Sequence, residues 1–181
     1  MARRCAIRQD AARNRTAILE AATALFDREG VEGVSMDDIA EAAGVGKGTV
    51  FRRFGDRTAL IEAVLEPRVR ELREAVESGP PPLGPGGTVA AYVDALFDFV
   101  WRNRPLIRAL EHRGPDAYYA NDASQFWIAE LARRLEGVDA DYLAHAVLTA
   151  LRADVIDYLI SARGMTRERI RAGVQLVAAA R

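Results

Sequence analysis

The sequence predicts an all-α protein of about nine helices, and three observations support this fold class. The strong helix formers Ala, Leu, Arg and Glu dominate nearly every segment. Apolar residues recur three and four positions apart, which places them on one face of a helix. No segment alternates apolar and polar residues as a half-buried strand does. Because half of the 181 residues are apolar, the chain can also bury a sizeable core.

The N-terminal part of the chain contains clear helix start and stop signals. Ser35 is suited to cap a short helix, and Asp38 stands at the position that completes a capping box. Gly44 is expected to end that helix in the left-handed region. The expected helices here cover residues 10–29, 36–43 and 46–54.

A longer helix is expected from Asp56 to about Ser78. Pro67 lies inside it and is expected to kink it, pushing Glu66 out of helical geometry. The Pro- and Gly-rich stretch 79–87 predicts a surface loop. The helices expected after the loop cover residues 88–103, 105–112, 115–135, 139–162 and 166–180.

The net charge of the chain argues against two classes of protein. A formal net charge of −1 argues against a nonspecific nucleic-acid coat or a membrane-surface protein. Arginines nevertheless gather at the N-terminus, where a basic arm would gain from releasing DNA counterions. The single cysteine, Cys5, and the absence of a long apolar stretch predict a cytoplasmic protein. The N-terminal arginines are Arg3, Arg4, Arg8, Arg13 and Arg15.

An enzyme is one class of protein to consider, and the sequence offers no catalytic site for one. His112 and His145 stand far apart, no nucleophile is placed beside a base, and no set of metal ligands occurs. We therefore expect no catalytic residues, no metal and no cofactor. A second class to consider is an architectural DNA-binding protein that binds no small molecule. The near-neutral charge and the aromatic C-terminal half argue against this class.

The second and third helices, both short and joined by a glycine-containing turn, form a helix-turn-helix pattern. The major groove of DNA admits one α-helix, so a recognition helix needs a second helix behind it. Small apolar residues suit that close packing. They are Ala40, Ala43, Val45 and Val50.

The run from Gly33 to Leu60 resembles the signature of the TetR family of transcriptional regulators. The matching positions are Ile39-Ala40, Ala43-Gly44-Val45, Gly48-Thr49, Phe54 and Leu60. This resemblance implies a DNA-binding domain over residues 1–55 and an effector-binding and dimerisation domain over residues 56–181. It further implies a homodimeric repressor that a small-molecule effector releases from a near-palindromic double-stranded operator.

Two positions depart from the family pattern. Gly46 stands where the family has Ser or Thr, and Phe51 where it has Tyr, so two hydroxyl donors to phosphate are missing. Arg53 and Arg57 could compensate with charge-assisted phosphate contacts. Lys47, beside the small Gly48, is expected to contact base edges, with an exposed surface lysine as the alternative. The expected DNA-contacting residues are Ser35, Met36, Gly46, Lys47, Gly48, Thr49, Phe51, Arg52, Arg53 and Arg57.

The helix expected over 88–103 is apolar almost all round, with Asp94 and Asp98 as its main polar stripe. Its aromatic residues, with those of the next long helix, could form an apolar effector pocket, and an ordinary core is the alternative. A face of the helix 139–162 could line the pocket, face a partner subunit or face solvent. The expected effector-contacting residues are Phe97, Trp101, Tyr118, Trp127, His145, Thr149 and Arg152.

The last expected helix has an apolar stripe of Ile170, Val174 and Val177. Members of the TetR family pair their last two helices into a four-helix bundle between subunits, and this stripe fits such a pairing. The resemblance therefore places the dimer interface at the C-terminal end of the chain.

Overall fold

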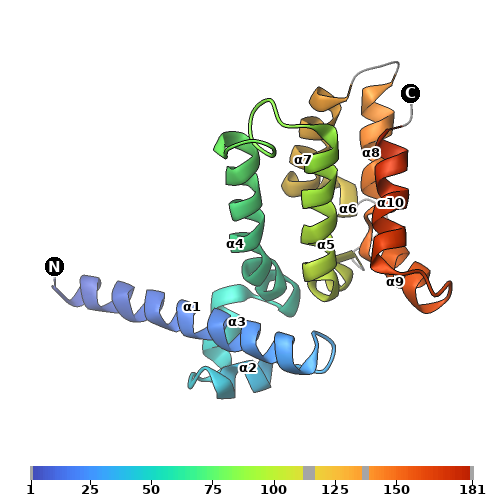
Figure 1. The fold of residues 1–181 in the computed structure, drawn as a ribbon. Helices are drawn as coiled ribbons and strands as arrows, with labels where there is room; N and C mark the ends of the chain where they lie inside the picture. Colours follow the sequence, from blue (N-terminus) through green and yellow to red (C-terminus); the bar gives the residue numbers. More distant parts are fainter. Residues whose placement is uncertain (1, 112–116, 136–138, 180–181) are drawn as a thin grey trace. The chain divides into compact units, whose positions relative to one another are not determined.

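The computed structural model describes residues 2–111, 117–135 and 139–179, with side chains described from residue 10 onward and from residue 118 in the second range. These residues form ten α-helices and no strand, which confirms the predicted all-α fold (Figure 1). Among the described residues no helix is long and apolar enough to cross a membrane.

The chain divides into two compact units, residues 1–67 and residues 68–181. The division falls inside helix α4 (Arg57–Ser78), beyond the boundary expected from the sequence at residue 55. The first turns of α4 explain this position, because Leu60 and Ile61 are buried and the Arg57 guanidinium donates to backbone carbonyls of the first unit.

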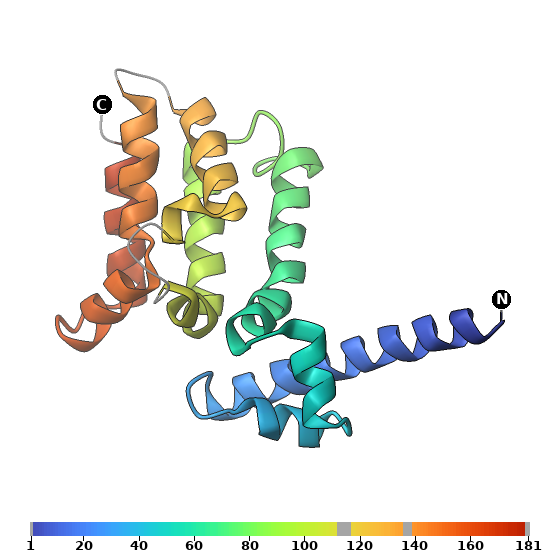
Figure 2. The same cartoon turned by 180° about the vertical axis from the view of Figure 1, so that it is seen from behind.

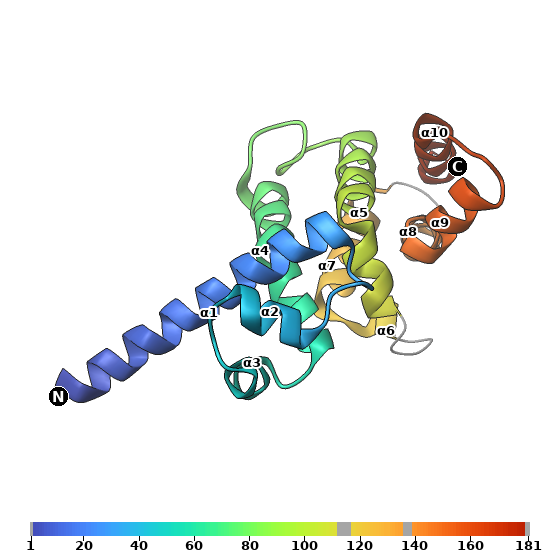
Figure 3. The ribbon, with the colours of Figure 1, turned by 90° about the horizontal axis from the view of Figure 1, so that it is seen from below.

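The first unit contains α1 (Ala2–Glu29), α2 (Met36–Ala42), α3 (Lys47–Phe54) and the start of α4. Helix α2 packs against both α1 and α3, and the N-terminal part of α1 extends beyond them (Figure 3). The apolar residues of these helices form the core of the unit. Its most buried members include Ile18, Ala22, Val34, Ile39, Val50 and Leu60.

The capping signals of the sequence are confirmed. The Ser35 hydroxyl accepts a hydrogen bond from the Asp38 amide at 3.2 Å, and the Asp38 carboxylate accepts from the Ser35 amide at 2.8 Å. Hydrogen bonds from Ser35 hold the pKa of the Asp38 carboxyl below its usual value. Gly44 has φ +64°, so it ends α2 in the left-handed region as expected.

The prediction for Glu66 is wrong, because α4 continues through both Glu66 and Pro67. Proline lacks the N–H that would bond to the Ala63 carbonyl, so it removes one hydrogen bond without ending the helix. The chain nevertheless divides into its two units directly after Pro67.

The second unit contains the rest of α4 and six further helices (Figure 2). These helices are α5 (Val89–Glu111), α6 (Ala117–Ala120), α7 (Asp122–Arg134), α8 (Ala140–Ala150), α9 (Ala153–Ser161) and α10 (Arg167–Ala178). Helix α5 packs against α6, α7, α9 and α10, which explains why it is apolar almost all round. Its polar stripe forms ion pairs with α10, from Asp94 to Arg171 at 2.8 Å and from Asp98 to Arg167 at 2.7 Å.

Several helix boundaries differ from the sequence predictions, and the first is the start of α1, which lies at Ala2 rather than at residue 10. Helix α5 runs through Pro105, so the helices expected over 88–103 and 105–112 are one. The segment expected as one helix over 115–135 divides at Asn121, whose side chain caps α7. Residues 112–116 and 136–138, with His112, Gly114 and Gly137, lie outside the described residues. The loop expected over 79–87 is confirmed.

The single helix expected over 139–162 is also wrong, because α8 ends at Ala150 and α9 begins at Ala153. Glu111, at the end of α5, supplies the reason. Its carboxylate accepts hydrogen bonds from the amides of Ala153 and Asp154 at 2.9 and 3.0 Å, so it caps α9 from a distant part of the chain. Glu111 is buried, and this burial raises the pKa of its carboxyl.

Replacing Glu111 with Ala is expected to destabilise the protein by roughly 1–3 kcal/mol, because two amides at the start of α9 lose their acceptor. The free energy of unfolding in urea, measured at one protein concentration, tests this. Glu77→Ala is the matched control, since Glu77 is an exposed helical glutamate, and it should change stability by less than about 0.5 kcal/mol. Equal effects of the two substitutions would contradict the capping role of Glu111.

Candidate nucleic-acid interface

Helix α3 carries a buried inner face and an exposed outer face. Val50 is fully buried, whereas Gly48, Phe51 and Arg52 are exposed. The turn before α3 is closed by a hydrogen bond from the Val45 amide to the Ala40 carbonyl at 3.0 Å. The α2–α3 pair is therefore a helix-turn-helix that holds a short helix with one side open to solvent.

Lys47 is the first residue of α3, and its side chain is 61% exposed. Its ammonium Nζ lies 2.6 Å from the Asp37 carboxylate on α2 and 6.0 Å from the centre of the Phe51 ring. Asp37 could not be predicted from the sequence, because its neighbour Asp38 accounts for the capping signal and no periodicity links α2 to Lys47.

The surface around Lys47 is sterically open. Apart from its adjacent residues and the backbone of its own helix, a Cβ added at Gly46 or at Gly48 would meet no atom within 4 Å. Gly46 occupies the N-cap position of α3 without a side-chain hydrogen bond, so the first amides of α3 have no side-chain acceptor from the N-cap residue. Thr49 is half-buried. A flat surface can therefore approach the N-terminal turn of α3 closely.

Arg52 and Arg53 are exposed at the end of α3. Neither forms an ion pair with any residue whose position the structure describes. The adjacent Phe51 ring is 41% exposed. Two unpaired guanidinium groups beside an open helix face can bind phosphate oxygens.

Arg57, the other arginine expected at DNA, faces inward instead. Its guanidinium donates to the carbonyls of Val31 and Val34 and lies 5.9 Å from the centre of the Phe26 ring. These contacts close the loop between α1 and α2. These contacts could not be predicted from sequence patterns, because they link residues 23 and 26 positions apart.

The two residues expected at the start of α2 are less available than the α3 residues. Met36 is only 8% exposed, so its side chain belongs to the core and is removed from the candidate interface. The Ser35 hydroxyl takes part in the capping box and also donates to the Asp38 carboxylate at 2.7 Å.

Of the N-terminal arginines, Arg13 and Arg15 have described side chains, and each lies near a carboxylate. Arg13 pairs with Asp10 at 2.5 Å, whereas Arg15 lies 3.8 Å from Glu66 and 5.7 Å from the centre of the Phe54 ring. The side chains of Arg3, Arg4 and Arg8, and of Cys5, lie outside the described residues.

The expected effector residues of the second unit lie in separate places. Phe97 is fully buried and stacks on Trp101 at 5.6 Å, and the Arg104 and Arg167 guanidiniums face the Trp101 ring. Trp127 is buried, and its carbonyl accepts from the Tyr92 hydroxyl at 3.1 Å.

The remaining expected residues meet where α6 lies beside the junction of α8 and α9. The Tyr118 hydroxyl donates to the Leu148 carbonyl at 2.9 Å, and the Arg152 guanidinium lies 4.9 Å from the centre of the Tyr118 ring. Thr149 shares a 2.8 Å hydrogen bond with the Tyr119 hydroxyl, and the Tyr119 ring lies 6.4 Å from that of His145. Arg152 also forms an ion pair with Asp154 at 2.6 Å, and the His145 ring lies 2.8 Å from the Asp141 carbonyl.

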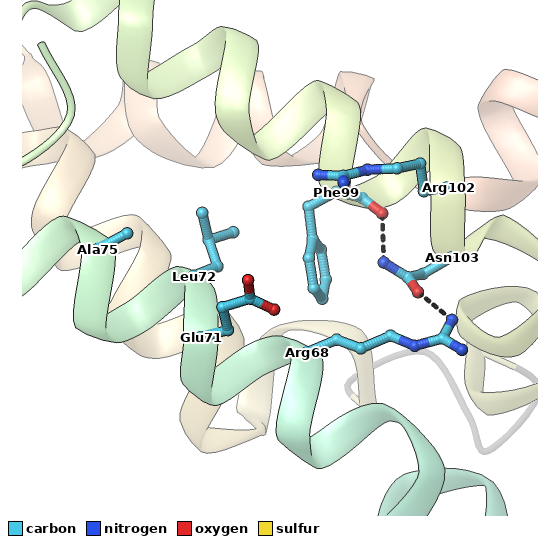
Figure 4. A pocket seen from close by; sticks show the side chains of 7 residues that line it. All are labelled: Arg68, Glu71, Leu72, Ala75, Phe99, Arg102 and Asn103. Carbon is cyan, nitrogen blue, oxygen red and sulfur yellow. Dashed lines mark hydrogen bonds between the residues drawn. The ribbon is translucent and has the colours of Figure 1, made fainter. Parts of the chain in front are cut away.

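A cavity of about 380 Å³ opens elsewhere in the second unit, between α4 and α5 (Figure 4). The Arg68 guanidinium donates to the Asn103 amide oxygen at 2.6 Å, and the Asn103 amide nitrogen donates to the Phe99 carbonyl at 2.8 Å. The cavity is lined by Arg68, Glu71, Leu72, Ala75, Phe99, Arg102 and Asn103. None of the seven effector residues expected from the sequence lines it.

Comparison with known proteins agrees with this geometry. Residues 18–64 match the model of the family described as bacterial regulatory proteins, tetR family. An HTH-type transcriptional regulator of Staphylococcus aureus strain MRSA252 is 26% identical over 176 residues, which cover 91% of this chain and 92% of that relative. Another regulator, from strain USA300, is 47% identical over 60 residues, which cover 33% of this chain and 32% of that relative.

Solved structures share the fold over nearly the whole chain. A TetR/AcrR-family regulator of Thermobifida fusca is 20% identical with a TM-score of 0.63, and the match covers 91% of this chain and 96% of the other. NalD, the secondary repressor of the MexAB-OprM multidrug efflux pump in Pseudomonas aeruginosa, is 22% identical with a TM-score of 0.57, covering 94% and 96%. The multidrug binding protein EbrR, complexed with imidazole, is 20% identical with a TM-score of 0.61, covering 90% and 93%.

The helix-turn-helix of α2 and α3, the match of residues 18–64 and the shared all-helical fold agree with one another. Residues 18–64 are therefore similar to the DNA-binding domain of the tetR family of bacterial regulatory proteins, and the whole chain has a fold similar to that of solved TetR-family regulators.

Proposed function

We propose that this protein is a sequence-specific transcriptional repressor of the bacterial cytoplasm, which binds a near-palindromic operator as a homodimer and leaves it when a small molecule binds. The observation that carries the proposal is the outer face of α3. Lys47, Arg52 and Arg53 are exposed there around an open glycine surface, while Val50 anchors the opposite face. A helix with these two faces suits the major groove.

The three basic side chains of α3 have different tasks in this proposal. Lys47 stands at the N-terminal end of the helix, the end that contacts base edges in helix-turn-helix proteins. Arg52 and Arg53 stand at the other end and lack ion-pair partners among the described residues, which suits contacts with the phosphate backbone.

Exposed apolar side chains of the C-terminal helices support the proposed dimer. Tyr142 on α8 is 68% exposed and Leu176 on α10 is 73% exposed, and these two helices pack against each other. Tyr158 on α9 is 57% exposed. Large apolar side chains that remain exposed on adjoining helices are typical of a surface that a partner covers.

The α4–α5 cavity is the proposed effector site. Its volume lies within the range of small-molecule pockets, and it combines apolar Leu72 and Phe99 with the charged Arg68 and Arg102. Helix α4 lines this cavity and also continues into the first unit. A change in α4 on effector binding could therefore be transmitted along the helix to the DNA-binding unit.

Sequencing of duplexes retained from a random DNA pool tests the proposal as a whole. We expect a dyad-symmetric operator whose half-sites lie about 34 Å apart, or a multiple of this, because a two-fold dimer presents its two recognition helices at that spacing. Light scattering should show a dimer at micromolar concentration. A monomer in light scattering, or a selected sequence without dyad symmetry, would contradict the proposal.

Lys47→Ala is expected to cost about 1–3 kcal/mol on the selected operator and to relax its sequence preference, because a base-edge contact is lost. Arg53→Ala should weaken binding to operator and random duplex alike and flatten the salt dependence, because a phosphate contact is lost. Titration of both duplexes at several salt concentrations separates the two results.

Arg57→Ala is the comparison variant, since it removes the same charge as Arg53→Ala. It should lower the melting temperature, because the loop carbonyls of Val31 and Val34 lose their donor. Arg53→Ala should leave the melting temperature within a degree or two. If Lys47→Ala and Arg53→Ala behaved identically on both duplexes, the proposed division of tasks would be wrong.

Leu72→Trp should raise the effector concentration needed to release the protein from its operator by at least about tenfold, because the indole fills the cavity. A panel of drug-sized aromatic anions and cations, with imidazole included, supplies the probe that releases the wild-type protein. Thr149→Trp is the control. Thr149 is exposed and belongs to the seven effector residues expected from the sequence, none of which lines the cavity. If Thr149→Trp prevented release and Leu72→Trp did not, the effector site would lie among the residues expected from the sequence and not in the cavity.

A further inference from the structure

The ion pair between Lys47 and Asp37 places a hydrogen-bond donor and an acceptor side by side at the candidate DNA interface. The two charged atoms are 2.6 Å apart, and their side chains are 61% and 57% exposed. Lys47 begins α3, and Asp37 lies in the first turn of α2. The pair therefore joins the two helices of the helix-turn-helix on the surface beside Gly48.

Neither helix needs Asp37 as a cap. The capping box of α2 consists of Ser35 and Asp38, and the Asp37 carboxylate contributes no bond to it. The pair also adds little stability, since both partners are more than half exposed to water. As an acidic residue in the first turn of α2, Asp37 also interacts favourably with the helix dipole, but this interaction does not require the contact with Lys47.

An acidic side chain at this position opposes nonspecific DNA binding. DNA phosphates attract cations and repel a carboxylate, so Asp37 reduces the attraction that Lys47 would exert on any sequence. The pair as a whole is neutral and can approach base edges without that repulsion. Such a pair favours a partner that offers both an acceptor for the ammonium and a donor for the carboxylate.

A G·C base pair offers this combination in the major groove. Guanine presents the acceptors N7 and O6, which suit a lysine, and cytosine presents an N4 amino donor, which suits an aspartate. The O6 and N4 atoms are hydrogen-bonded to each other across the base pair, so they lie about 2.9 Å apart. This separation is close to the 2.6 Å between Nζ of Lys47 and the Asp37 carboxylate oxygen.

Other base pairs fit less well. With adenine in the place of guanine, an N6 donor faces the ammonium. With thymine in that place, an acceptor and a donor remain at the centre of the pair, but the thymine methyl replaces the N7 acceptor. An inverted C·G pair exchanges the donor and acceptor positions.

We propose that Asp37 is a specificity-determining residue, and that Lys47 and Asp37 recognise one G·C base pair of each half-site as a unit. This proposal rests on the proposed function. Lys47 donates to guanine, and Asp37 accepts from the cytosine amino group of the same base pair.

Selection from a random duplex pool, followed by titration of single base-pair variants of the selected operator, tests this recognition. The proteins compared are the full-length wild type, Asp37→Asn, Lys47→Ala, the double variant and Glu41→Gln. Glu41→Gln is the matched control, because it removes one exposed negative charge from the same helix and leaves the Lys47–Asp37 pair intact.

The wild type should select a G·C pair at one place in each half-site. Asp37→Asn should lower the discrimination at that place by roughly tenfold, since an amide can donate as well as accept, and should leave other places unchanged. Glu41→Gln should keep the wild-type preference. Lys47→Ala should bind the operator more weakly than the double variant does, because it alone leaves a carboxylate without its lysine counterion near the DNA phosphates.

Equal discrimination by Asp37→Asn and the wild type would overturn the proposal and leave the pair as a surface ion pair. An equal loss at all places with Asp37→Asn and Glu41→Gln would also overturn it, because net charge alone would then account for the effect. A wild-type protein that selects no sequence would overturn this proposal and the proposed repressor together, whereas the first two outcomes leave the repressor standing.

Discussion

The burial of one face of α3 is the constraint on which the rest of the DNA-binding unit depends. An isolated helix of eight residues is not stable in water, so α3 exists because Val50 is buried and α2 packs against it. The positions of Lys47 and Arg53 therefore follow from the packing of α2 and α3. Gly44 supports this packing, since its left-handed backbone lets the chain turn between the two helices.

Arginines in the second unit perform structural tasks that the net charge of the chain does not reveal. Several guanidiniums lie over aromatic rings, such as Arg73 over Phe126 at 4.1 Å and Arg134 over Tyr92 at 4.7 Å. The Nε atoms of both arginines are buried without a hydrogen-bond partner in the described structure. The attraction between a cation and an aromatic ring offsets part of that lost hydration. The high arginine content therefore serves the packing of the second unit.

Local signals in the sequence predicted the local structure, and long-range contacts decided the rest. The Ser35 cap and the Gly44 turn could be predicted because each involves residues close in the chain. The break between α8 and α9 could not, because it depends on Glu111, 42 positions before Ala153. The inward side chain of Arg57 and the Asp37 partner of Lys47 were missed for the same reason, since hydrophobic periodicity carries no information about which polar groups meet.

Helix α4 also limits how this regulator can be divided or recombined. Its first turns supply buried Leu60 and Ile61, and its later turns line the cavity of the second unit. A hybrid joined to another regulator at residue 55 would separate the DNA-binding unit from part of its own core. A junction after Pro67 keeps each compact unit whole. The exchange of C-terminal units between proteins of this fold is therefore easiest within a helix, although loops are the usual place for domain boundaries.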